Sequence, residues 1–120
     1  MIIGIQSSKK FTDYNVFLRA MGTALSSMDP EDSEFTIMSA GPARLNEMGM
    51  EFSNISERSL KARGIAIKMV RVPVAWFDTN MQVIDYFMYF SLPKEPVTPL
   101  VSRAEDLDIE VGIYLSLIHI

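Results

Sequence analysis

The chain has 120 residues, of which 48% are hydrophobic and 22% are charged, as expected for one soluble globular domain. It has no cysteine, which excludes disulfides, thiolate metal sites and cysteine nucleophiles. The net charge of −4 disfavours a long nucleic acid as partner, because proteins that bind nucleic-acid backbones usually carry a basic surface. The apolar runs are only strand-sized and the N-terminus lacks a signal-peptide pattern, so we expect no membrane association and a cytoplasmic location.

The first half of the chain alternates short apolar runs with segments of helical period. Residues 2–5 predict a buried strand, and Thr12 or Asp13 can cap the helix that follows and ends at Pro30. Residues 35–38 predict a second strand. A second helix is expected from about residue 43, with apolar side chains at one face: Leu45, Met48, Phe52 and Ile55.

The second half continues the alternation. Gly64 stands where a helix C-cap is expected, and residues 65–72 predict a third strand. Residues 75–80 are interpreted as a loop that leads into a short helix ending near Ile84. The aromatic run 86–90 predicts a strand buried on both faces, and a last helix and strand are expected over residues 97–107 and 109–113.

This order of elements predicts the fold class. Strands that alternate with helices and read as apolar runs are typical of a parallel sheet covered on both faces. We therefore expect an α/β, doubly wound domain with a mostly parallel five-stranded sheet in the order 3-2-1-4-5 and helices on both faces.

The last residues raise a separate question. Residues 115–120 resemble the translation of a sequencing adaptor, so a single domain is predicted over residues 1–114, followed by a foreign tail. The alternative is a genuine final strand. His119, the only histidine, lies in this tail and is given no catalytic role.

Two segments of small and polar residues follow the first and second predicted strands. In open α/β sheets ligands bind beyond the carboxyl ends of the strands, where helix N-termini offer free N–H groups to anions. Serine hydroxyls and a lysine or arginine would add donors. The same residues would also suit plain turns. The candidate ligand contacts are Gln6, Ser7, Ser8 and Lys9 in the first segment and Ser39, Ala40, Gly41, Pro42 and Arg44 in the second.

Three short motifs, at residues 3–14, 39–48 and 72–76, resemble those of YspA-like, cpYpsA-related members of the SLOG superfamily. The first is similar to the family's strand, Gly-Ser-Arg-like turn and Asp-Tyr. The second is similar to its Ser-Gly-Gly-Ala-Arg-Gly-Ala-Asp segment, and the third to a strand running into Pro-Ala-Asp-Trp. The resemblance spans roughly residues 2–113 and implies a Rossmann-like fold that recognises a nucleotide or a nucleotide-derived ligand.

Position by position, the resemblance places Ser8 on the family's serine, Lys9 on its arginine, Gly41 on its second glycine, Asn46 on its aspartate and Trp76 on its tryptophan. The chain also departs from the family. Ala40 replaces the first glycine, Arg44 is displaced by one residue, and residues 91–98 replace a glycine-rich loop that closes the phosphate site in many relatives. The pattern of the phosphoribohydrolase branch is therefore absent.

Other candidate residues have two interpretations each. Asn46 is a ligand contact or a helix-surface residue, and Glu47 is a catalytic carboxylate or a solvated side chain. Trp76 either stacks on a base or packs across a loop, and Asp78 either serves as a carboxylate or caps a helix. The sequence contains no spacing of metal ligands, and no cofactor or metal is predicted.

The function predicted from these patterns is binding of a phosphorylated, nucleotide-like small molecule, as a sensor or sequestering module. A hydrolase that cleaves an N-glycosidic or phosphate bond is an alternative, and a protein–protein interaction module with a vestigial pocket is another. The sequence leaves open whether the chain forms a homo-oligomer.

Overall fold

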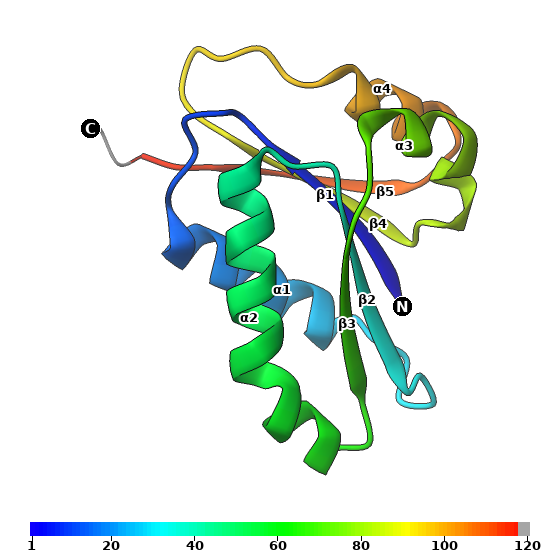
Figure 1. Ribbon diagram of the computed structural model, residues 1–120. Coiled ribbons are helices and arrows are strands. Elements are labelled where there is room, and N and C mark those ends of the chain that lie inside the picture. The colour runs from blue at the N-terminus through cyan, green and yellow to red at the C-terminus, as the bar shows by residue number, and fades with distance from the viewer. Residues whose placement is uncertain (118–120) are drawn as a thin grey trace.

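The computed structural model describes residues 1–117 and shows an α/β fold (Figure 1). Within these residues the strands are β1 (Ile2–Ser7), β2 (Glu34–Ser39), β3 (Ala66–Arg71), β4 (Tyr86–Ser91) and β5 (Glu110–Leu115). The helices are α1 (Tyr14–Ser26), α2 (Ala43–Ala62), α3 (Val74–Asn80) and α4 (Pro99–Asp106), with a short 3₁₀ turn η1 (Met81–Val83).

The described strands form one five-stranded sheet in the order β3-β2-β1-β4-β5, and every neighbouring pair is parallel. The central strand β1 pairs with β2 through Ile3↔Ile37 and with β4 through Ile5↔Met88. The predicted Rossmann-like fold and strand order are therefore confirmed.

Helices cover both faces of the sheet. On one face α1 and α2 pack against fully buried strand residues such as Ile5, Ile37 and Phe90. On the other face α3, η1 and α4 pack against Phe87 and Tyr89 of β4. Because β1 and β4 are buried on both faces, their sequences read as apolar runs rather than as alternating patterns.

The predicted loop at residues 75–80 is wrong, because α3 already begins at Val74. Pro73 precedes the helix and its carbonyl accepts a hydrogen bond from the Trp76 N–H, which starts the first turn. The turn carries Phe77 into the core, where its ring meets Phe87 edge-on at 5.5 Å. Burial of an aromatic side chain therefore decides the local structure here, and the local sequence pattern did not show it.

Ile55 is also placed differently from the prediction. Leu45, Met48 and Phe52 are buried under α2 as expected, whereas Ile55 is 67% exposed. At 100° per residue, Ile55 lies outside Met48 at one margin of the buried stripe, whereas Gly49 and Leu60 lie on the opposite side of its centre.

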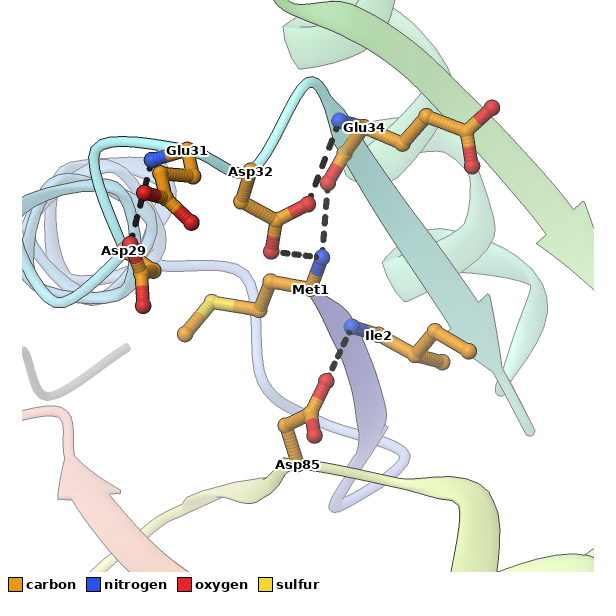
Figure 2. Close-up of polar contacts among 7 residues, drawn as sticks. All are labelled: Met1, Ile2, Asp29, Glu31, Asp32, Glu34 and Asp85. Carbon is orange, nitrogen blue, oxygen red and sulfur yellow. Dashed lines mark hydrogen bonds and ion pairs between the residues drawn. The ribbon is translucent and has the colours of Figure 1, made fainter.

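The chain start is held at the amino end of the sheet (Figure 2). The Met1 ammonium donates to Oδ2 of Asp32 at 2.5 Å and to the Glu34 carbonyl at 2.7 Å, and the Ile2 N–H donates to Asp85 Oδ2 at 2.7 Å. The hydrogen bond from the ammonium, followed by the Glu34 N–H, lowers the pKa of Asp32. These contacts lie at the opposite end of β1 from the predicted ligand segments.

At the other terminus, β5 ends at Leu115, which pairs with Ser91, and Ser116 is buried. The domain boundary predicted at residue 114 thus falls one residue before the end of β5. The adaptor origin of residues 115–120 stays a prediction. His119 and the rest of residues 118–120 lie outside the described residues.

Candidate functional site

The structure brings the two predicted ligand segments together at the carboxyl edge of the sheet. The Ala40 N–H donates to the Ile5 carbonyl at 2.9 Å, which continues the pairing of β1 and β2 past the strand end. The Ser7 N–H then donates to the Gly41 carbonyl at 3.2 Å. The loop after β1 and the loop after β2 therefore border each other, as parallel neighbours at a sheet centre require.

The loop after β2 is held by the hydroxyl of Ser39, which is fully buried. This hydroxyl donates to Asn46 Oδ1 at 2.6 Å and accepts from the Gly41 N–H at 3.2 Å. Gly41 has a φ of 84° and is joined to Pro42 by a cis peptide bond. With its Oδ1 engaged by Ser39, Asn46 keeps its Nδ2 group as a donor for a ligand.

Helix α2 begins at this loop with an open first turn. Its N-cap residue is Pro42, which makes no capping hydrogen bond with its side chain. Among the described residues, no side chain or backbone carbonyl accepts from the N–H groups of Ala43 and Arg44. These groups carry the partial positive charge of the helix N-terminus and are suited to an anion.

A cavity of about 630 Å³ opens beside this helix start, within the size range of small-molecule sites. Arg71, the last residue of β3, reaches it from the sheet and has no ion pair among residues 1–117. The wall of the cavity is mixed in polarity and is formed by Ala43, Asn46, Glu47, Met50, Glu51, Asn54, Ile55 and Arg71.

Arg44 and Glu47 pair with each other on the surface of α2. Nη1 of Arg44 lies 3.1 Å from Oε2 of Glu47, and the two side chains are 52% and 67% exposed. Such an exposed pair contributes little to stability, about 0–1 kcal/mol. Of the two, only Glu47 lines the cavity.

The loop after β1 uses most of its own N–H groups. Besides the Ser7 bond, the Ser8 N–H donates to the Phe90 carbonyl at 2.9 Å and the Phe11 N–H to the Ser8 carbonyl at 3.1 Å. The Lys10 N–H makes a long contact of 3.4 Å with the Ser8 hydroxyl. This loop consequently offers a ligand side chains rather than free backbone amides, and Lys9 and Lys10 are its exposed cations.

Gln6 is the predicted contact with an unusual environment. Its Oε1 atom is buried and has no hydrogen-bond partner among the described residues. Gln6 pairs in register with Tyr89, so both side chains project from the sheet face that α3 and α4 cover. Burial, together with the nearby Glu95 carboxylate, raises the pKa of Tyr89. The hydroxyl of Tyr89 thus stays protonated in the neutral range and remains a donor.

Trp76 and Asp78 lie on α3. Trp76 packs edge-on against Phe77 with ring centroids 5.2 Å apart, and it is partly buried against the same core cluster as Ala40 and Val72. The backbone carbonyl of Asp78 accepts from the Arg103 guanidinium. Neither residue lines the cavity beside α2.

The sequence prediction did not include Arg71, Glu51 and Asn54 as site residues. A signal for Arg71 existed, since it is a cation at the end of a predicted strand, the same position that singled out the other segments. Glu51 and Asn54 follow Glu47 at helical spacing, so extending the helix face from Glu47 would have found them.

Some classes of site and partner find no support in the described residues. Residues 1–117 contain no group of three or more His, Cys, Asp or Glu side chains arranged to hold a metal ion. None of their helices combines the length and the apolar character needed to cross a membrane. Comparison of the chain with protein-family models, curated proteins and solved structures finds no match.

Proposed function

We propose that the protein binds a nucleotide or a nucleotide-derived phosphorylated ligand at the carboxyl edge of the sheet, where β2 leads into α2 and β3 ends. The observation that carries the proposal is the open first turn of α2, which meets a cavity of about 630 Å³. The resemblance to the SLOG superfamily in residues 39–48 adds to it, because the matched segment leads into this helix.

The donors at this point suit a phosphate group. Ala43 with its N–H group and the Asn46 amide line the cavity from α2, and the Arg71 residue lines it from the end of β3. Charge-assisted hydrogen bonds to such an anion are roughly twice as strong as neutral ones. The acidic and apolar remainder of the wall, from Glu47 to Ile55, would contact the sugar and base.

Gly41 keeps these donors accessible. A Cβ atom at Gly41 would lie 3.7 Å from Asn46 Nδ2 and 3.8 Å from the Ala43 nitrogen. A phosphate oxygen bound to either nitrogen at about 2.9 Å would compete with that carbon for space. The absence of a side chain at Gly41 therefore serves the loop conformation and the access of an anion to the donors.

A thermal-shift screen followed by calorimetry tests the proposal. The ligands are mono-, di- and cyclic nucleotides and ADP-ribose, and a bound ligand should raise the melting temperature. Arg71→Ala should weaken binding of the best ligand roughly tenfold, the equivalent of one charge-assisted hydrogen bond. Arg58→Ala is the matched control, because Arg58 is an exposed arginine further along α2 that does not line the cavity.

Either of two results contradicts the proposal: no shift with any nucleotide, or equal affinity in Arg71→Ala and the parent. The first result would favour a protein–protein interaction module. Raising the salt concentration should weaken binding if the arginine contributes through its charge.

A hydrolase is the second candidate, because the Glu47 carboxylate lines the same cavity. If Glu47 acts as a general base on water, the ligand found in the screen should give a cleaved product by chromatography, and Glu47→Gln should abolish that product. If the ligand is unchanged after prolonged incubation with the parent, the hydrolase hypothesis is contradicted and binding without catalysis is supported.

A further inference from the structure

A strap formed by residues 92–98, between β4 and α4, lies beside the loop after β1 (Figure 1). A turn closed by the Glu95 N–H and the Leu92 carbonyl, at 3.2 Å, directs the strap back toward the sheet. The Ser8 hydroxyl donates to Glu95 Oε2 at 2.8 Å, and the Tyr89 hydroxyl makes a weak contact with the Pro96 carbonyl at 3.5 Å. The Glu95 carboxylate therefore fastens the strap to Ser8.

The hydrogen bond between Ser8 and Glu95 lies at the switch point of the sheet, where the strand order reverses. β2 and β3 lie on one side of β1 in the sheet, and β4 and β5 lie on the other side. The strand order therefore reverses at β1. The loops after β1 and β4 flank this point, where open α/β sheets bind their ligands. Ser8 is only 5% exposed, so the hydroxyl at the switch point is closed off while Glu95 holds it.

Glu95 presents to Ser8 the same kind of acceptor as a phosphorylated ligand would, an anionic oxygen. A carboxylate oxygen and a phosphate oxygen are both anionic acceptors for a serine hydroxyl. Within residues 1–117 no Lys, Arg or amino terminus lies within 4.0 Å of the Glu95 carboxylate, so its charge is not neutralised by an ion pair. An arriving anion would meet both an occupied donor and a like charge.

We infer that Glu95 is an internal competitor, a carboxylate that occupies the Ser8 hydroxyl and must leave before an anionic ligand can use it. The inference rests on the proposed function and concerns its regulation through a second contact of the ligand, because Ser8 and Glu95 lie outside the cavity beside α2. Ligand binding is coupled to release of the strap, and the affinity of the parent is lowered by the free energy needed to break the Ser8–Glu95 contact. The strap is also expected to be more mobile in the bound state than in the free state.

Titration calorimetry with ADP-ribose tests the inference on the full chain. Glu95→Ala removes the competitor and should tighten binding roughly tenfold, the value of one charge-assisted hydrogen bond. Glu95→Gln keeps the shape but removes the charge, and should tighten binding by a smaller factor. Glu105→Ala is the control, because it removes the same charge from an exposed position on α4.

The second part of the experiment compares the effect of Ser8→Ala on affinity in two backgrounds, Glu95→Ala and the parent. In the Glu95→Ala background the Ser8 hydroxyl is free for the ligand, so its removal should weaken binding roughly tenfold. In the parent background the same substitution should weaken binding much less, since Glu95 already holds the hydroxyl. Thermal unfolding of each variant confirms that it is folded before titration.

The outcomes separate the two proposals. If the parent binds and both Glu95 variants bind no more tightly, the competitor role is overturned while the proposed function stands. If Ser8→Ala costs the same in both backgrounds, the competitor role is likewise overturned. If neither the parent nor either Glu95 variant binds any nucleotide of the screen, the proposed function itself is overturned.

Discussion

The hydroxyl of Ser116 donates a hydrogen bond to Oδ2 of Asp13 at 2.9 Å, across 103 residues of sequence. Both residues are buried, at 2% and 7% exposure. Asp13 is also the N-cap of α1, since its Oδ1 accepts from the Val16 N–H at 3.2 Å. One carboxylate thus joins the start of the first helix to the segment after the last strand.

Ser116→Ala is expected to lower the free energy of unfolding by about 1 kcal/mol, because it leaves one oxygen of a buried carboxylate without its donor. Urea denaturation measures the effect. Ser102→Ala, an exposed serine of α4, is the control and should be close to neutral. An unchanged unfolding free energy in Ser116→Ala would show that the contact with Asp13 adds nothing to the fold.

Gly4→Ala should destabilise the protein by about 1–3 kcal/mol through overpacking. A Cβ at Gly4 would lie 2.6 Å from Phe77 Cε1 and 2.9 Å from Phe87 Cδ1, and both rings are fully buried. Gly22→Ala, in the middle of α1 with no atom near its Cβ position, should instead stabilise by about 0.5–1 kcal/mol. Thermal or urea unfolding of both variants measures the effect. If both substitutions changed the free energy of unfolding in the same direction, the packing around Gly4 would be contradicted.

Asp32 provides a prediction of pH dependence. Its folded-state pKa is lowered by the Met1 ammonium, so its contribution to stability is present above the unfolded pKa and is lost as the pH falls through the folded pKa. Asp32→Asn should lower stability at neutral pH and flatten the acid limb of the stability curve, measured by urea unfolding from neutral pH downward. Glu57→Gln, an exposed residue of α2, should leave that limb as it is in the parent.

Much of the fold followed from local patterns. The β1 and β4 runs are apolar because both faces are buried, and this continuity predicted a parallel sheet correctly. The alternation of strands and helices, with right-handed crossovers, predicted the strand order correctly. The helical residues 74–80 were missed, because burial of Phe77 against Phe87 of β4, rather than a local period, decides the structure there.

The candidate site was predictable to a similar degree. The position of Ser39 and Gly41 after a strand indicated their place at the carboxyl edge. The contact of Ser8 with Glu95 could not be predicted, because the two residues are 87 positions apart in the sequence and meet only through the path of the strap. The same holds for Asp13 and Ser116, which no local motif connects.

Gly41→Ala and Gly64→Ala form the pair that bears on ligand binding. Both glycines have a positive φ, 84° and 80°, so alanine should cost about 1–2 kcal/mol of stability at either position. Gly64 lies at the far end of α2, with no atom near its Cβ position. Only the Cβ at Gly41 would stand beside the Asn46 and Ala43 donors, so only Gly41→Ala should lose affinity.

Calorimetric titration of ADP-ribose, or of the best ligand from the screen, into the parent and these two variants tests the binding site most directly. We expect the parent and Gly64→Ala to bind with equal affinity and Gly41→Ala to bind at least tenfold more weakly, at a temperature where all three are folded. Equal affinity in all three, or no binding heat in the parent, would contradict an anion site at the start of α2.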